Sequence, residues 1–385
     1  IRDRTLHRDG QATTIPSRPG VPVFFDSGAN AYYSSANPQN SVKLPGSKVR
    51  AEVIGTEGDT MQVCFGAADQ CQTATPDATV DRWAGKDRYA TAAEVAKEFG
   101  TSETVYMASG QGFADAMSST AAAGSGMVRT QSMPDEDGKE VPVLLTRQDR
   151  IPAQTTEALK ALGAKRVILV GGETAVSAKV ADELEASGLS VERISGANRY
   201  ETSANVAKDF GTGVDTLYVA SGDDKAFADA LAGSALAGSK DVPVLLTRGD
   251  KVLPVTRNAV RSLAPKKVVV LGGDDVVSQK VADELGATER LAGPNRYATA
   301  VEVAKQFPAG YDFTAVATGA DYPDALTGGA LAAKEGGPLL LTRPDRLLKV
   351  VGDHVAAHPT QTVVLGSTAA VSQDVEDALK DLLGL

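Results

Sequence analysis

Short apolar runs alternate along the chain with longer amphipathic segments. Residues 167–170 (VILV) are four apolar residues in succession, as in a strand of a parallel sheet that is buried on both faces. Residues 88–99 (RYATAAEVAKEF) place apolar side chains at steps of three and four, which is typical of a helix with one buried face. This alternation predicts an α/β fold in which right-handed crossovers place helices on both faces of parallel sheets.

The pattern occurs three times in the same order, which identifies an internal triplicate. Its first block reads RWAGKDRYATAAEVAKEF from Arg82, RISGANRYETSANVAKDF from Arg193 and RLAGPNRYATAVEVAKQF from Arg290. Three further blocks follow in each copy: an apolar run ending in Ser-Gly or Thr-Gly, a Leu-Leu-Thr-Arg run, and a Val-rich run ending in Gly-Gly or Gly-Ser. Four ordered blocks in triplicate predict three tandem domains of one fold.

The boundaries follow from closing each unit. The runs 79–80, 190–194 and 288–291 are expected to be first strands, so that each unit is (βα)4 and the repeats span 76–188, 189–286 and 287–385. The first copy carries a polar, Gly-containing insertion at 126–140, which is expected to be an exposed loop. Residues 1–75 differ, and their polar start and alternating runs predict a flexible lead and a small β-rich domain.

The net charge of the chain limits the classes of partner that it can bind. With 42% hydrophobic and 23% charged residues the chain has a globular composition, and its net charge is −10 with a pI of about 5.0. Residues 1–75 hold seven basic and seven acidic residues, so the acidic excess lies in the repeats. This sign excludes a general binder of nucleic acid or of anionic membranes, and an anionic partner would need a local basic site.

Two features point to a secreted protein. No apolar run reaches the roughly 18 residues that cross a bilayer, and no signal peptide stands at Ile1, so we expect an export signal to have been removed. Cys64 and Cys71 are the only cysteines, and their spacing suits a disulfide that closes a hairpin in an oxidising compartment. Two buried free thiols are the alternative. Two cysteines and three histidines cannot supply a zinc site in every repeat, and no metal or cofactor is expected.

The first block opens a helix in each copy. A short side-chain acceptor that satisfies a free amide of the first turn is expected as N-cap at Asp87, Asn198 and Asn295. The residues that follow are Arg88, Arg199 and Arg296. A cation there opposes the positive end of the helix dipole, so either a carboxylate of the same repeat or an anionic ligand should offset it. The carboxylates at the matching place are Asp115, Asp229 and Asp324.

Glycine-rich turns follow two strands of each repeat, where the helix N-termini of an open α/β sheet present free amides to anions. The first turns are Ser109-Gly110, Ser221-Gly222 and Thr318-Gly319. The second turns are Gly171-Gly172, Gly272-Gly273 and Gly366-Ser367, with expected N-caps at Ser177, Ser278 and Ser372. Glycines are also what any tight strand-to-helix turn needs, so a purely structural role is the alternative.

The Leu-Leu-Thr-Arg run combines a buried strand with an arginine at its carboxyl end. The leucines, most simply core residues, are Leu144, Leu145, Leu245, Leu246, Leu340 and Leu341. The arginines are Arg147, Arg248 and Arg343. At a strand end each guanidinium faces the same rim as the helix N-termini, which makes it a ligand candidate, with an ordinary solvated arginine as the alternative.

Catalysis finds little support in the sequence. No histidine recurs across the repeats, no G-x-S-x-G motif occurs, and Ser109 and Ser221 have no base at a repeated position. Three equivalent sites without a nucleophile favour multivalent binding over turnover. An α/β enzyme or nucleotide-binding protein that uses the Gly-rich turns, and a surface adhesin or receptor-binding protein, stay as the alternatives.

At these motifs the sequence resembles the cell-wall-binding repeat 2 family of Gram-positive surface proteins. The resemblance rests on R-x-x-G-x-[DN]-R-Y-x-T-[AS], [AS]-[ST]-G before [AP]-D-A-[LM], P-[VL]-L-L-T and [LV]-G-G-x-x-x-V-S, and it covers about residues 80–385. It implies three flavodoxin- or toprim-like (βα)4 domains around a pseudo-threefold axis. It also implies that the paired leucines of the Leu-Leu-Thr strand are important for attachment.

The resemblance implies a secreted, S-layer-like, non-catalytic protein that binds an anionic polymer of the Gram-positive cell wall, or peptidoglycan, without a covalent bond. Nucleic acid is not an expected partner, and residues 1–75 are available for a surface-protein or host partner. Repeat three departs from the pattern at Gly366-Ser367 and repeat two carries two extra residues near Asp224, so the three sites are expected to be unequal. Because the repeats are acidic, polymer binding should be confined to arginine-lined grooves and should weaken with salt.

Overall fold

A computed structural model describes residues 78–126, 140–224 and 226–385, without the side chains of 113–115, and the backbone of short strands elsewhere. The chain divides into two compact units, Ile1–Thr75 and Pro76–Leu385. Within the insertion at 126–140, β8 (Arg129–Thr130) pairs antiparallel with β9 (Met133–Pro134), and the predicted exposed loop otherwise lies largely outside the described residues.

The N-terminal unit contains antiparallel strands. One pair is formed by β1 (Thr5–Arg8) and β2 (Gln11–Thr14), and a three-stranded sheet has the order β3 (Ser41–Lys43), β4 (Arg50–Glu57), β5 (Thr60–Gly66). Cys64 lies in β5, whereas Cys71 lies outside the described residues. The disulfide between them therefore stays a prediction.

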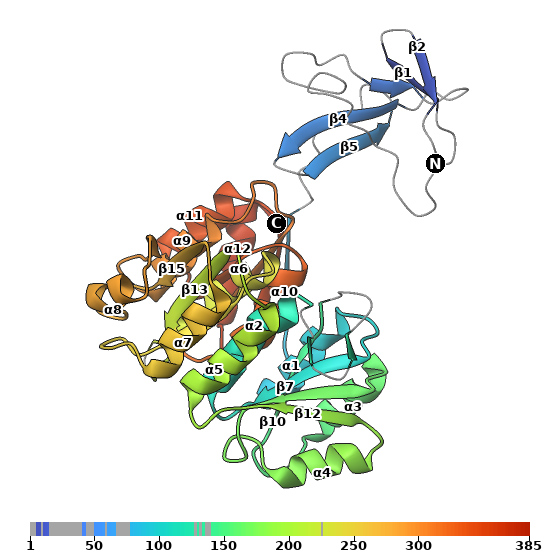
Figure 1. The fold of residues 1–385 in the computed structure, drawn as a ribbon. Coiled ribbons are helices and arrows are strands. Elements are labelled where there is room, and N and C mark those ends of the chain that lie inside the picture. Colours follow the sequence, from blue (N-terminus) through green and yellow to red (C-terminus); the bar gives the residue numbers. More distant parts are fainter. Residues whose placement is uncertain are drawn as a thin grey trace. The chain divides into compact units, whose positions relative to one another are not determined.

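The second unit is an α/β structure of three parallel sheets with four strands each, as predicted (Figure 1). Three strands of each sheet come from one repeat, in the order Leu-Leu-Thr strand, first Gly-turn strand, second Gly-turn strand. They are β10 (Val143–Thr146), β7 (Thr104–Ser109) and β11 (Arg166–Val170); β14 (Val244–Thr247), β13 (Thr216–Ser221) and β15 (Lys267–Leu271); and β18 (Leu339–Thr342), β17 (Phe313–Thr318) and β19 (Gln361–Leu365). Nearly all of their residues are buried, as sheets covered on both faces require.

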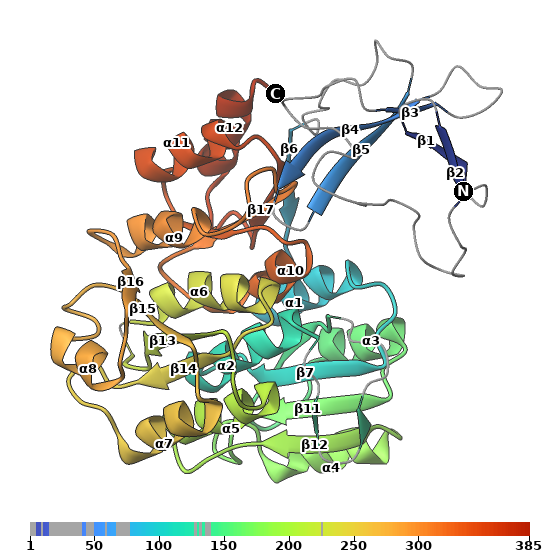
Figure 2. The same ribbon diagram turned by 45° about the horizontal axis from the view of Figure 1, so that its top comes forward.

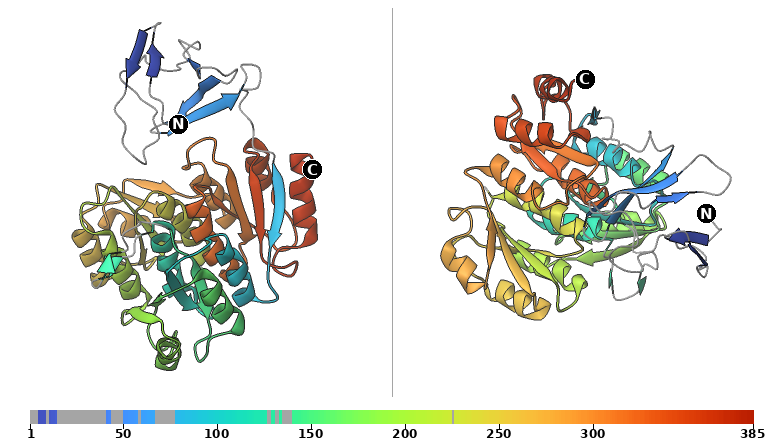
Figure 3. Two further views of the ribbon diagram at one scale, coloured as in Figure 1. Left: turned by 90° about the vertical axis from the view of Figure 1, so that its right-hand side faces the viewer. Right: turned by 90° about the horizontal axis from the view of Figure 1, so that it is seen from above.

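The fourth strand of each sheet comes from the start of another repeat. These strands are β12 (Ser190–Ile194) beside β11, β16 (Glu289–Leu291) beside β15, and β6 (Thr79–Trp83) beside β19. The predicted first strands therefore exist, but each completes the sheet of the preceding repeat, and β6 completes that of the last one (Figure 3). The expectation that each first strand belongs to the sheet of its own unit is wrong. For β12 and β16 the reason is a short connection from the preceding helix, which delivers the strand to the nearest free sheet edge. The strand β6 fills the equivalent free edge beside β19.

The helices of the repeats follow their strands in regular alternation. In repeat one they are α1 (Arg88–Lys97), α2 (Phe113–Gly124), α3 (Ala153–Leu162) and α4 (Ala178–Ala186). In repeat two they are α5 (Arg199–Ala207), extended by a 3₁₀ turn (Lys208–Phe210), α6 (Phe227–Ser239), α7 (Pro254–Leu263) and α8 (Gln279–Glu284). In repeat three they are α9 (Arg296–Ala304), α10 (Pro323–Lys334), α11 (Lys349–Ala357) and α12 (Gln373–Leu383).

The helices α2, α6 and α10 meet at the centre of the three repeats (Figure 2). Small residues at equivalent positions make this possible: a Cβ added at Gly124 would lie 2.4 Å from the Cβ of Ala333, and one added at Gly238 would lie 2.8 Å from it. The three helices therefore approach almost backbone to backbone about a pseudo-threefold axis. One hydrophobic core runs through all three repeats around them.

Candidate functional site

The three predicted caps of the arginine helices are confirmed. The carboxylate of Asp87 accepts hydrogen bonds from the amides of Tyr89 and Ala90, at 3.1 and 2.9 Å, and Asn198 and Asn295 do the same for α5 and α9. The serine caps hold only in part. Ser278 accepts from the Val281 amide at 3.4 Å, whereas the hydroxyls of Ser177 and Ser372 cap no amide and lie buried without a hydrogen-bond partner among the described residues.

Each arginine after these caps binds a backbone carbonyl of its own repeat. Arg88 donates to the Gly110 carbonyl at 2.5 Å, Arg199 to Gly222 at 2.7 Å and Arg296 to Gly319 at 2.7 Å. The guanidinium groups also meet acidic side chains: Arg199 pairs with Asp224 of its own repeat at 2.5 Å, and Arg88 pairs with Asp321 of repeat three at 3.2 Å. Each arginine thus ties its helix to the first Gly turn, and the side chains of Arg88 and Arg199 stay about one-third exposed.

One of the two expectations was that each recurring aspartate pairs with the arginine of its own repeat. This is wrong for Asp229 and Asp324, the two whose side chains the structure describes. Asp229 faces Arg296 and accepts a hydrogen bond from Thr299, both of repeat three. Asp324 of repeat three faces Arg88 and Thr91 of repeat one in the same way. The side chain of Asp115 lies outside the described ones. The aspartate meets the next repeat because that repeat's first strand lies in the aspartate's own sheet.

A threonine that recurs in the first block carries this contact, and the sequence reasoning missed it. The hydroxyl oxygens of Thr91, Thr202 and Thr299 accept from the amides of Gly85, Gly196 and Gly293, each at 3.1 Å. In two of the three junctions the same hydroxyl is hydrogen-bonded to the aspartate of the preceding repeat. The threonine of the R-Y-x-T motif occurs in all three copies, and no role was assigned to it from the sequence. That recurrence was the signal that could have revealed the contact.

Two clefts lie at the carboxyl ends of the sheets, each at a junction between two repeats. The cleft between repeats two and three has a volume of about 480 Å³, and its lining includes Asp229, Gly273, Asn295, Arg296 and Thr299. The cleft between repeats three and one has about 310 Å³ and is lined by the equivalent residues Asp324, Ser367, Asp87, Arg88 and Thr91. Each cleft therefore joins a helix N-terminus and its arginine from one repeat to a carboxyl group and a second Gly turn from another.

The carboxyl groups in the clefts are unusual in their surroundings. Asp229 is 6% exposed, and the Oδ1 atoms of both Asp229 and Asp324 have no hydrogen-bond partner in the described part of the chain. Burial raises the pKa of each to about 6, although the threonine hydrogen bond and the nearby arginine act in the opposite direction. Each cleft thus combines one arginine with a carboxyl group that titrates near neutrality. Further carboxylates also line the clefts, Asp223 and Asp275 in one and Asp87 and Asp321 in the other.

The second Gly turns are held by the arginines that begin the repeats. Arg193 donates to the carbonyls of Gly171 and Val176, both at 2.8 Å, and Arg290 donates to Gly272 at 2.7 Å. Gly171, Gly272 and Gly366 have φ of 114, 98 and 96°, a region that glycine adopts without strain. The structural role in the turn accounts for Gly171, Gly272 and Gly366. Gly273 also lines a cleft, and a Cβ added at Gly172 would meet no atom within 4 Å.

The arginines at the strand ends do not line either of the two clefts. The guanidinium of Arg147 lies 5.1 Å from the ring centroid of Tyr89, Arg248 pairs with Asp250 at 2.9 Å, and Arg343 pairs with Asp345 at 3.5 Å. The paired leucines of all three strands are fully buried, with none of their surface exposed. The structure thus brings together only part of the predicted ligand set.

No metal-binding arrangement of three or more His, Cys, Asp or Glu side chains occurs in the described residues. In the same part of the chain, none of the helices is both long and apolar enough to cross a membrane. The chemistry that the clefts offer is hydrogen bonding and charge: a guanidinium for an anion, and a carboxyl oxygen for a hydroxyl donor.

The fold and sequence have relatives among known proteins. The chain is 31% identical over 314 residues to the N-acetylmuramoyl-L-alanine amidase LytC of Bacillus subtilis (strain 168), covering 80% of this chain and 60% of the relative. It is 29% identical over 309 residues to the amidase enhancer of the same organism, covering 79% and 40%. The chain thus spans about half the length of these relatives.

Solved structures agree. Cwp6 from Clostridium difficile superposes with a TM-score of 0.70 at 26% identity, over 87% of this chain and 51% of that one. Cwp8 from Clostridium difficile gives a TM-score of 0.67 at 28% identity, over 80% and 52%. The family described as cell wall binding domain 2 matches residues 82–181, 193–282 and 290–376, one match for each repeat. The chain therefore belongs to the cell wall binding domain 2 family.

Proposed function

We propose that the three repeats hold a secreted protein on the Gram-positive cell surface by binding an anionic secondary polymer of the cell wall, without catalysis and without a covalent bond. The observation that carries the proposal is the convergence of motif residues in the clefts. Residues that recur in every repeat and are far apart in sequence, such as Asp229 and Arg296, meet in one cleft at a sheet edge. The recurrence of these residues is explained if each junction binds one unit of the same repeating ligand.

The chemistry of a cleft suits one unit of a sugar polymer that bears an anionic group. The Arg296 guanidinium, at the N-terminal end of α9, offers donors to the anion. The unpartnered Oδ1 of Asp229 offers an acceptor to a sugar hydroxyl. Weak binding at more than one junction of the same chain would add up to strong attachment through avidity.

Charge sets a limit on this binding. The net charge of −10 lies on the repeats, so long-range attraction of a polyanion is absent and the contacts must be local. Binding should therefore weaken with salt, by screening of the exposed part of each arginine. The amidase and amidase enhancer activities named for the relatives belong to longer proteins, and no such activity is proposed for these repeats.

The test is co-sedimentation of the full chain with Gram-positive walls, before and after hydrofluoric acid removes phosphodiester-linked polymers, across a salt series. We expect salt-sensitive binding that is lost on stripping, and a loss of roughly tenfold in affinity for Arg296→Gln, which disables one cleft. The matched control is Arg261→Gln on the exposed surface of α7, which should bind as the unaltered chain does.

Three other outcomes would redirect the assignment. Binding that survives stripping would identify peptidoglycan as the ligand instead of the polymer. No binding to any wall would contradict anchoring and favour an adhesin or an enzyme. Equal losses of wall affinity for Arg296→Gln and Arg261→Gln would show that the binding site lies outside the clefts.

A further inference from the structure

The three shared strands differ in how the chain delivers them. The strand β12 follows α4 after three residues, and β16 follows α8 after four, so in both cases the chain itself holds the strand next to the sheet that it completes. By contrast, β6 enters sheet three with no covalent link to that repeat, because residues 1–78 precede it and α1 of repeat one follows it. The junction between repeats three and one is therefore closed by non-covalent contacts alone.

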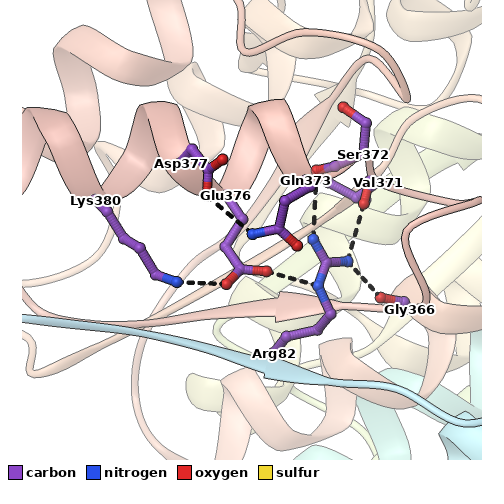
Figure 4. Close-up of polar contacts among 8 residues, drawn as sticks. All are labelled: Arg82, Gly366, Val371, Ser372, Gln373, Glu376, Asp377 and Lys380. Carbon is purple, nitrogen blue, oxygen red and sulfur yellow. Dashed lines mark hydrogen bonds and ion pairs between the residues drawn. The ribbon is translucent and has the colours of Figure 1, made fainter.

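Four hydrogen bonds of the Arg82 side chain join β6 to repeat three (Figure 4). Arg82 stands at the same position as Arg193 and Arg290, and it binds the carbonyls of Gly366 and Val371 at 2.8 and 2.9 Å as they bind theirs. In addition, its Nε donates to the carboxylate of Glu376 at 2.7 Å, and both side chains are at least 85% buried.

Glu376 has no counterpart in the other repeats. The equivalent residues of α4 and α8 are Ala181 and Ala282, and neither Arg193 nor Arg290 meets a carboxylate at such short range in the described residues. The carboxylate also accepts from Lys380 at 2.6 Å, which fixes its position on α12. The other two junctions have ion pairs between adjacent strands instead, Arg166–Glu192 at 2.8 Å and Lys267–Glu289. Among the described residues, an ion pair between a first strand and the last helix beside it thus occurs at the one junction where the chain does not hold the strand in place.

The contacts of Arg82 also connect the two walls of a cleft. Its carbonyl partners, Gly366 and Val371, bracket Ser367, Ala369 and Ala370, which line the cleft between repeats three and one. On the other wall, the chain runs from Trp83 at the end of β6 directly into Gly85, Asp87 and Arg88. Displacement of β6 would therefore move both walls of this cleft and leave the cleft between repeats two and three in place.

We infer that β6 is a latch, held by the Arg82–Glu376 pair, whose closure forms one of the ligand clefts and so sets how many sites the repeats present. This inference rests on the proposed function for its ligand but not for the latch itself. In it, Glu376 is a positioning residue: it acts on the ligand through Arg82 and the β6 strand.

A built-in reporter allows the latch to be followed. Trp83 is the only tryptophan of the chain, and its ring packs on Phe313 of repeat three with 6.2 Å between centroids. Opening of β6 would expose the indole to water, so its fluorescence emission should shift to longer wavelength. This signal reports the latch whether or not any wall is present.

The experiment uses the full chain with Glu376→Ala, Glu376→Gln and Asp377→Ala, the last an exposed neighbour on α12 that serves as the matched control. We expect Glu376→Ala to shift the Trp83 emission to longer wavelength and to lower the affinity for walls by roughly tenfold, the loss of one site. Glu376→Gln, which keeps an acceptor for the Arg82 Nε, should restore part of both signals. The control should change neither.

A double-mutant comparison identifies the cleft on which the latch acts. Arg88→Gln should add little to the loss caused by Glu376→Ala, since both disable the cleft between repeats three and one, whereas Arg296→Gln should add its full effect. A disulfide between Thr79→Cys and Gln361→Cys, which face each other in register, should restore affinity to the Glu376→Ala chain until a reductant is added.

The inference and the proposed function fail in different ways. If the unaltered chain does not bind walls, the function fails, and the Trp83 signal still decides whether the latch exists. If walls are bound but Glu376→Ala and Arg82→Ala both leave Trp83 unshifted, the pair does not hold the latch. If Trp83 shifts while wall affinity stays the same, or if the losses from Arg88→Gln and Glu376→Ala are additive, the latch does not control the cleft.

Discussion

The carboxyl group of Asp229, in repeat two, accepts a hydrogen bond from the hydroxyl of Thr299, in repeat three. The same hydroxyl accepts from the amide of Gly293, so one threonine connects the turn of its own repeat to the buried acid of the preceding one. An aspartate buried in this way has one oxygen satisfied and one without a partner among the described residues. Its charge state therefore responds to pH and to whatever fills the cleft.

Wall binding should tighten as pH falls from 7 to 5. Burial raises the pKa of Asp229 and of Asp324 to about 6, so acidification removes a negative charge from each cleft beside an arginine, and a polyanion is then repelled less. The other charged groups that act on Asp229 are Arg296 and Asp275, and those that act on Asp324 are Arg88 and Asp321. The measurement is co-sedimentation at pH 5, 6 and 7 at constant ionic strength.

The double variant Asp229→Asn/Asp324→Asn is the control for that pH dependence. An amide oxygen still accepts from the threonine hydroxyl but does not titrate, so the variant should bind at pH 7 about as well as the unaltered chain binds at pH 5. A pH slope that persists in the variant would assign the titration to other groups, including those of the polymer.

The stability of repeat three should depend on pH through His354. Its imidazole is buried and hydrogen-bonded to Tyr311 at 2.8 Å, with the ring of His358 stacked 4.4 Å away. Burial, followed by the electrostatic effect of the neighbouring His358 and Lys305, lowers the pKa of His354 to about 4. The unfolded chain binds this proton near pH 6.5 and the folded chain only near pH 4, so the stabilising effect is complete above pH 6.5 and is lost as pH falls toward 4.

Chemical denaturation between pH 8 and pH 4 measures this effect. His354→Gln should lower the free energy of unfolding at pH 8, because it disturbs the contact with Tyr311, and should also reduce the dependence of that free energy on pH below 6.5. An unchanged slope in the variant would show that carboxyl groups alone account for the acid sensitivity.

Gly85→Ala should destabilise the chain by about 3 kcal/mol. An added Cβ would lie 2.3 Å from the Cβ and 2.4 Å from the carbonyl carbon of Ala90, and the backbone of α1 cannot yield locally. Gly172→Ala is the matched control, because a Cβ there meets nothing within 4 Å, and its effect should stay within about 0.5 kcal/mol. The same control tests Gly172 as a ligand contact: unchanged wall affinity would remove it from the candidate site.

Periodicity and repetition were enough to predict the fold class, because strands buried on both faces and amphipathic helices leave local signals. The N-caps Asp87, Asn198 and Asn295 were predictable for the same reason. The pairing of β6, β12 and β16 with the sheet of another repeat was not predictable. Strand pairing is non-local, and the position of a strand within a repeat does not determine which sheet it joins. The partner of Asp229 was missed as a direct consequence: with each first strand in its own sheet, Arg199 would have been the nearest guanidinium.

The buried leucines allow the attachment expected for the Leu-Leu strand to be separated from folding. Leu245 has no exposed surface, so Leu245→Ala removes core contacts and should cost about 2–5 kcal/mol of stability. If the leucine acts only through the fold, wall binding should fall in proportion to the folded fraction, and it should return when a lower temperature restores folding. The control is Leu382→Ala, at 46% exposure on α12, which should leave both the stability and the wall binding unchanged.

A fully folded Leu245→Ala chain that no longer binds walls would show instead that the strand shapes the ligand site directly. That result would extend the site from the clefts into the sheet beneath them, because Leu245 lies two residues from the end of β14, where Thr247 completes the strand.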